Sequence, residues 1–128
     1  MAKETEPLPE ELARLVLEHI DSVPHMEALV LVWEDQARGW SEAEIAERIY
    51  QPLEQTRTIL RDLQRRELVV TTPEGRYSPS GQPQTRELIA KITALYRSNV
   101  YRVATLIHSR APRAVREFAR AFDIRGKN

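Results

Sequence analysis

The sequence has no cysteine, only four glycines and few aromatic residues, at 6%. The lack of cysteine excludes disulfides, thiolate metal sites and thiol redox sensing. Long apolar runs are also missing, because the longest, residues 28–33, is far too short to cross a bilayer. The start, residues 1–9, is acidic and contains prolines, without the apolar segment of a signal peptide. We therefore expect a cytoplasmic protein with no membrane partner.

Motifs of catalysis and metal binding are likewise not recognisable. His19, His25 and His108 are too far apart in the sequence to form a local metal motif. The chain also has no glycine-rich phosphate loop and no recognisable Ser/His/Asp or Cys/His arrangement. We predict that the protein is not an enzyme and that it uses no cofactor and no metal.

The composition favours a folded, helix-rich chain. The 128 residues fit one compact domain, or a small domain with an added oligomerisation helix. A hydrophobic content of 41% is enough for a core, and 30% charged residues with few glycines favour a soluble helical protein.

A formal net charge of +0 conceals a strong asymmetry along the chain. Residues 1–85 contain 9 Lys+Arg against 16 Asp+Glu, and residues 86–128 contain 10 against 3. The two parts therefore carry −7 and +7. Such a division indicates either a charged partner or a basic tail that packs on the acidic part of the same chain.

Two helices are predicted in the first third of the chain. Residues 8–20 place apolar side chains on one face at helical spacing, which predicts an amphipathic helix. Ser22 is a suitable N-cap for a second helix over residues 24–35, with Pro24 in its first turn. Because this second helix is apolar nearly all round, we expect it to lie in the centre of the core.

The middle of the chain predicts two helices followed by a hairpin. Ser41 and Glu44 have the spacing of a capping box, which predicts a helix over residues 42–49. Pro52 can begin the next helix, which extends to about residue 67. The segments 68–72 and 76–78 are strand-like and flank a turn at Pro73, Glu74 and Gly75.

The polar face of the second of these helices favours DNA binding. In a helix-turn-helix the second helix enters the major groove, where polar side chains near its N-terminus reach base edges. We predict base contacts from Gln51, Gln55, Thr56, Arg57 and Thr58, and contacts mainly to phosphates from Arg61, Arg65 and Arg76. The alternative is an ordinary solvated face, on which Glu54 and Asp62 pair with the arginines.

A long helix with a heptad-like seam is predicted over residues 84–109. The seam consists of apolar side chains and one asparagine at spacings of three and four: Leu88, Ile92, Leu95, Asn99, Val103 and Leu106. We expect this face to form a homodimer, although it can instead fold back on its own domain. The asparagine is suited to specifying the register of a paired seam.

A basic arm is predicted to end the chain. Pro112 interrupts the long helix, and a final helix is expected over residues 113–122. The arm carries Arg113, Arg116, Arg120 and Arg125 beside a short apolar stripe. Three roles remain open: contact with phosphates, docking on the acidic part of this chain or its dimer mate, and capture of an acidic protein partner.

The stretch WSEAEIAERIYQPLEQTRTILRDLQRRELVVTTPEGRYSPS resembles the winged helix-turn-helix domain of bacterial transcriptional regulators. Its most specific parts are the capped SEAEIAERI, the helix-to-strand segment TRTILRDLQRRELV and the tip PEG. The resemblance covers roughly residues 26–80. It implies a mainly α fold with a small β-hairpin wing and binding to double-stranded DNA. It also implies that residues 24–35 complete the core and that residues 84–109 form the dimer.

These observations give a division of the chain and two functional hypotheses. We expect an N-terminal helix in residues 1–22, a winged helix-turn-helix domain in residues 23–80, and a helical dimerisation segment with a basic arm in residues 81–128. The first hypothesis is a dimeric DNA-binding transcriptional regulator. The second keeps the fold but makes it a protein interaction module of the transcription machinery.

Overall fold

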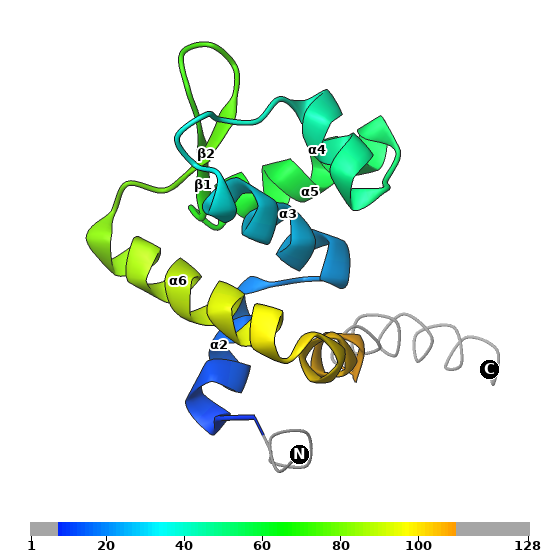
Figure 1. The fold of residues 1–128 in the computed structure, drawn as a ribbon, viewed down its shortest axis with the longest axis vertical. Helices are drawn as coiled ribbons and strands as arrows, with labels where there is room; N and C mark the ends of the chain where they lie inside the picture. The colour runs from blue at the N-terminus through cyan, green and yellow to red at the C-terminus, as the bar shows by residue number, and fades with distance from the viewer. Residues whose placement is uncertain (1–7, 110–128) are drawn as a thin grey trace, which may run out of the picture.

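The computed structural model describes residues 8–109. Its labelled elements are five helices and a two-stranded antiparallel hairpin. In chain order they are α2 Glu10–His19, α3 Val23–Glu34, α4 Glu42–Ile49, α5 Leu53–Arg65, β1 Val69–Thr71, β2 Tyr77–Pro79 and α6 Pro83–Ser98. Residues 100–109 are also helical. The hairpin and α4 lie at one end of the molecule, and α2 and residues 100–109 lie towards the other (Figure 1).

Helix α3 is the centre of the fold, as its apolar composition predicts. The Ser22 hydroxyl caps it by accepting a hydrogen bond from the His25 backbone N–H at 3.3 Å. Helices α4, α5 and α6 and strand β2 all pack on it. Met26, Leu29 and Val32 are fully buried there. A single hydrophobic cluster extends from Val16 on α2 to residue 107, so the described elements share one core.

The helix-turn-helix forms where the capping box and Pro52 place it. The Ser41 hydroxyl accepts from the Glu44 backbone N–H, and a Glu44 carboxylate oxygen accepts from the Ser41 N–H, both at 3.1 Å. Tyr50 ends α4 in the left-handed conformation, with φ 58°. Pro52 stands at the N-cap of α5. The sequence prediction of both helices is confirmed.

The wing is a short hairpin around the predicted turn. Strand β1 pairs with β2 in the register Val69 with Pro79, Val70 with Ser78 and Thr71 with Tyr77. Gly75 has φ +79°, which a glycine adopts without strain. Tyr77 also exchanges two backbone hydrogen bonds with Trp40, at 2.7 and 3.0 Å. The wing is therefore attached to the loop between α3 and α4.

The prediction of one continuous helix over residues 84–109 is wrong. Helix α6 ends at Ser98, and the chain changes direction at Asn99, where φ is −143° and ψ 51° (Figure 1). The Asn99 amide donates to the Ser98 hydroxyl at 2.9 Å and to the Leu95 carbonyl at 3.4 Å. Such local hydrogen bonds compete with helix continuation. The Asn99 carbonyl then accepts from the Val103 N–H at 2.9 Å and so begins the next helical segment.

No helix within residues 8–109 has both the length and the apolar character that crossing a membrane requires.

Candidate nucleic-acid interface

The outer face of α5 is exposed and polar. Gln55, Arg57, Thr58 and Arg61 all lie on this face. Together with Glu54 they line an open hollow of about 440 Å³. The opposite face of α5, formed by Ile59, Leu60 and Leu63 among others, is buried against the core. The helix therefore presents a continuous row of hydrogen-bonding groups to the exterior, as a recognition helix requires.

Two of the predicted base-contacting residues differ from the rest in exposure. Thr56 is 0% exposed, and its hydroxyl donates to the Pro52 carbonyl at 3.0 Å. Its assignment to base contact is wrong, because the residue belongs to the buried stripe of α5. Gln51, in the turn between α4 and α5, is half-buried, and its backbone N–H donates to the Ala46 carbonyl at 3.1 Å.

Arg57 is held by a carboxylate from the preceding helix. Its Nε donates to Glu42 Oε1 at 3.0 Å, and the Tyr77 hydroxyl donates to Glu42 Oε2 at 3.3 Å. Burial, together with the negative charge and hydrogen bond of Glu42, raises the pKa of Tyr77. Glu42 thus joins α5 to the wing. It also neutralises a cation that the sequence assigns to DNA.

The other arginines of α5 differ in their surroundings. Arg61 is exposed and forms no ion pair with a residue of the described part of the chain. Arg65 Nη2 contacts Asp62 Oδ1 at 2.6 Å, although its side chain is 66% exposed. Arg65 therefore fits the alternative in which the arginines of α5 pair with acidic neighbours on a solvated helix face. Arg61 is the arginine best placed to meet a phosphate without first losing a partner.

Arg76 attaches the wing to the start of the helix-turn-helix. Its Nη1 donates to the Gly39 carbonyl at 3.2 Å and to Glu44 Oε1 at 3.1 Å. Arg38 approaches the same Glu44 oxygen at 2.9 Å. Gly39 has φ +71°, and a Cβ there would lie 3.1 Å from the Arg76 Cβ. The Arg76 side chain is 40% exposed, so contact with a DNA backbone stays a prediction.

Glu44 gives this arrangement a pH dependence. The Ser41 backbone N–H, followed by Arg38 and Arg76, lowers the pKa of Glu44 from 4.5 to about 2. A pKa that is lower in the folded state adds stability above about pH 4.5, and this stability disappears as the pH falls towards 2. In urea titrations, we expect the stability difference between the wild type and Glu44→Gln to shrink as the pH falls through this window. A difference that stays constant would contradict the assignment.

Sequence reasoning missed exposed apolar groups and one acidic partner beside α5. Tyr50 is 89% exposed and Leu53 is 40% exposed at the turn between α4 and α5. Tyr50 is the C-cap of α4 in the left-handed conformation, and Leu53 is the first residue of α5. The sequence indicates for Glu42 only a place in the first turn of its helix, where a negative charge suits the helix dipole. Its contact with Arg57 spans fifteen positions and requires the tertiary fold.

The predicted dimer seam is occupied by the core of the same chain. Ile92 and Val103 are 0% exposed and Leu95 is 7% exposed. Leu88 and Leu106 are partly buried against the same cluster, and Asn99 is half-buried at the helix break. The fold-back alternative therefore describes this face, and the seam is wrong as a free surface. The basic arm, with Arg113, Arg116, Arg120 and Arg125, lies outside the described residues.

A different apolar surface lies where α2 meets residues 100–109. Tyr101 is 82% exposed and Val100 is 49% exposed. An open hollow of about 880 Å³ separates the two segments and is lined by Leu8, Ala13, Tyr101 and Leu106, among others. Exposed apolar surface of this kind marks interaction sites in many proteins.

Comparison with known proteins supports the fold but gives no family. No protein-family model matches the sequence, and no curated protein matches it. Among solved structures, the chain is similar to MepR, a transcription regulator of the Staphylococcus aureus multidrug efflux pump MepA. The two share 14% identity with a TM-score of 0.52, over 91% of this chain and 84% of MepR. The winged helix-turn-helix fold predicted from the sequence is confirmed.

Proposed function

We propose that the protein is a DNA-binding transcription regulator and not an enzyme, acting in the cytoplasm as a homodimer. The observation that carries this proposal is the outer face of α5, where Gln55, Arg57, Thr58 and Arg61 are exposed beside the wing. A helix presented in this way fits the major groove, with arginines for guanines and phosphates and short polar groups for other base edges. The similarity to MepR, itself a transcription regulator, supports the same reading.

Dimerisation belongs to this proposal through the surface formed by α2 and residues 100–109. Regulators with a helix-turn-helix commonly bind two half-sites as symmetric dimers, so a second copy has a geometric role. The apolar hollow beside Tyr101 offers the interface that the buried seam cannot. We therefore propose that the dimer forms through this surface and not through the predicted seam.

Salt-dependent binding to a duplex tests the proposal. The full chain is titrated into a labelled duplex of random sequence, and fluorescence anisotropy is recorded at low and moderate salt. Each phosphate neutralised adds about 0.9 to the slope of log K against log salt, so a dimer that makes several contacts gives a steep decline. Absence of binding at low salt would contradict the proposal. Light scattering on the same sample tests the dimer separately.

The second candidate is a protein interaction module. On the proposed DNA face, Glu42 pairs with Arg57 and Glu44 pairs with Arg76. These pairs make the face less basic than DNA-binding surfaces usually are, which favours a protein partner. In that case the basic arm would bind an acidic protein. A stoichiometric partner that co-purifies with the full chain and is lost on deletion of residues 110–128 would support it.

A further inference from the structure

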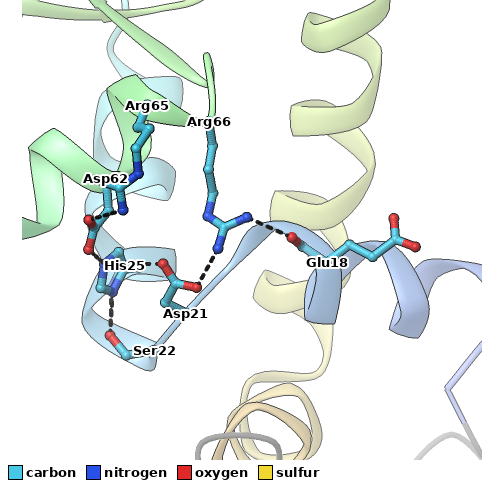
Figure 2. A network of polar contacts seen from close by, with 7 residues as sticks. All are labelled: Glu18, Asp21, Ser22, His25, Asp62, Arg65 and Arg66. Carbon is cyan, nitrogen blue, oxygen red and sulfur yellow. Dashed lines mark hydrogen bonds and ion pairs between the residues drawn. The ribbon is translucent and has the colours of Figure 1, made fainter. Parts of the chain in front are cut away.

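A second polar cluster lies at the other end of α5, at the corner between α2 and α3. Asp21 and His25 are four residues apart, and Asp62 comes from the second half of α5 (Figure 2). Asp62 Oδ2 lies 2.8 Å from His25 Nε2, and Asp21 Oδ2 lies 3.9 Å from the same nitrogen. The three ligand atoms are within 4.8 Å of one another. The cluster takes no part in the proposed DNA interface.

We propose that Asp21, His25 and Asp62 bind a divalent first-row transition metal ion such as Zn²⁺. An imidazole nitrogen and carboxylate oxygens are ligands that such ions accept. A tetrahedral zinc site with bonds of about 2.0–2.1 Å places its ligand atoms roughly 3.3 Å apart. The observed separations from His25 Nε2, 2.8 and 3.9 Å, lie on either side of this value. The two carboxylate oxygens lie within 4.8 Å of each other, so side-chain movement would complete the site.

The two carboxylates give the cluster its attraction for a divalent cation. With a neutral imidazole they carry two negative charges, which the ion would share with Arg65 and Arg66, the arginines that already contact their Oδ1 atoms. A proton on His25 Nε2 can form a hydrogen bond only with Asp62, the nearer carboxylate. An ion between the three ligand atoms would contact both Asp62 and Asp21. Burial alone would raise the pKa of Asp62, but hydrogen bonds from His25 and Arg65 outweigh it and hold that pKa below its ordinary value.

The outer contacts of the cluster orient the three ligands. Arg65 contacts Asp62 Oδ1 at 2.6 Å and Arg66 contacts Asp21 Oδ1 at 2.7 Å, so the Oδ2 atoms are directed at His25 (Figure 2). The Ser22 hydroxyl lies 2.6 Å from His25 Nδ1. The hydroxyl oxygen can accept a hydrogen bond from Nδ1–H, which leaves the Nε2 lone pair to the metal. Partners of this kind fix the orientation of metal ligands in known sites. The side chains of His25, Asp62 and Asp21 are 10%, 18% and 30% exposed, so the site is partly shielded from water.

Metal binding here would join α5 to the corner between α2 and α3. Arg66 already donates to the Glu18 carbonyl at 2.9 Å and so connects the same two regions. An ion would add a second connection at Asp62. The site stands independently of DNA binding, and its test uses no DNA.

Zinc titration of the full chain against a chromophoric chelator tests the proposal. We expect one zinc ion per chain in the wild type and a loss of affinity of at least about tenfold in Asp62→Asn and His25→Gln. The controls are Glu54→Gln, an exposed carboxylate on the same helix, and His19→Gln, another histidine of the chain. Both should bind zinc as the wild type does. Equal loss in a control, or no stoichiometric zinc in the wild type, would overturn the proposal.

If the Asp62 and His25 variants do not fold, zinc binding can be tested on the unaltered chain by NMR of its imidazole groups. The chain has three histidines, so its imidazole NMR spectrum is simple. The signals of His19 and His108 are identified by their loss in His19→Gln and His108→Gln. Zinc should then shift the remaining imidazole, that of His25. Shifts confined to the other two would refute the site.

Discussion

Replacement of both Arg57 and Arg61 by alanine is expected to weaken duplex binding by on the order of 100-fold at moderate salt. Each arginine that contacts a base or phosphate contributes roughly 1–3 kcal/mol, and 1.4 kcal/mol corresponds to tenfold. The slope of log K against log salt should also fall, by about 0.9 for each phosphate contact removed. Arg61 should account for more of the loss. Arg57 must first leave Glu42, with which it pairs at 3.0 Å.

The matched control removes the same charge elsewhere. Arg14 and Arg97 are 62% and 65% exposed and pair with Glu18 and Glu34, and none of these residues belongs to α5. The double variant Arg14→Ala with Arg97→Ala should bind the duplex nearly as the wild type does. Similar losses in both double variants would mean that net charge, and not the α5 face, governs binding. Fluorescence anisotropy at two salt concentrations decides between these results.

Opening the pair between Arg57 and Glu42 should have the reverse effect. In Glu42→Gln, Arg57 is released, and a carboxylate that would repel phosphate is removed. We expect a few-fold tighter binding in the same anisotropy titration, with a small loss of stability, because exposed ion pairs contribute about 0–1 kcal/mol. Weaker binding would show that Glu42 holds Arg57 in a productive position.

Local sequence signals predicted the helix-turn-helix because they act within a few residues. The capping box at Ser41 and Glu44 fixes the start of α4, and Pro52 fixes the start of α5. Both depend on backbone chemistry that the sequence displays directly. The turn at Gly75 is predictable for the same reason. The fold class therefore follows from the sequence alone.

Contacts between distant elements were not predictable in the same way. Asp62 appeared to be a partner for the arginines of its own helix, yet it also meets His25, thirty-seven positions away. Thr56 has the helical spacing of the inner stripe of α5 but was also assigned to base contact, and its burial decides between the two. The seam over residues 84–109 matched a heptad because a core-facing stripe and a dimer-facing stripe have the same spacing. Periodicity identifies an apolar face without identifying what covers it.

Replacement of Ile92 by alanine is expected to destabilise the folded chain by about 2–4 kcal/mol. Ile92 is 0% exposed, on the helix that packs against α2 and α3. Deleting its side chain removes buried contacts and leaves a cavity within one chain. In urea unfolding, the loss should therefore be the same at every protein concentration. If Ile92 instead joined two copies of the chain, the loss would depend on concentration.

Tyr101→Ala is the matched control, because the two substitutions separate folding from association. Tyr101 is 82% exposed, so its removal should change the stability of a single chain by less than about 0.5 kcal/mol. In light scattering it should shift the equilibrium towards the monomer, since it borders the hollow between α2 and residues 100–109. Ile92→Ala should leave the association of its folded fraction unchanged. If Ile92→Ala changed association and Tyr101→Ala did not, the dimer interface would be the predicted seam. That result would contradict the burial of Ile92 within one chain.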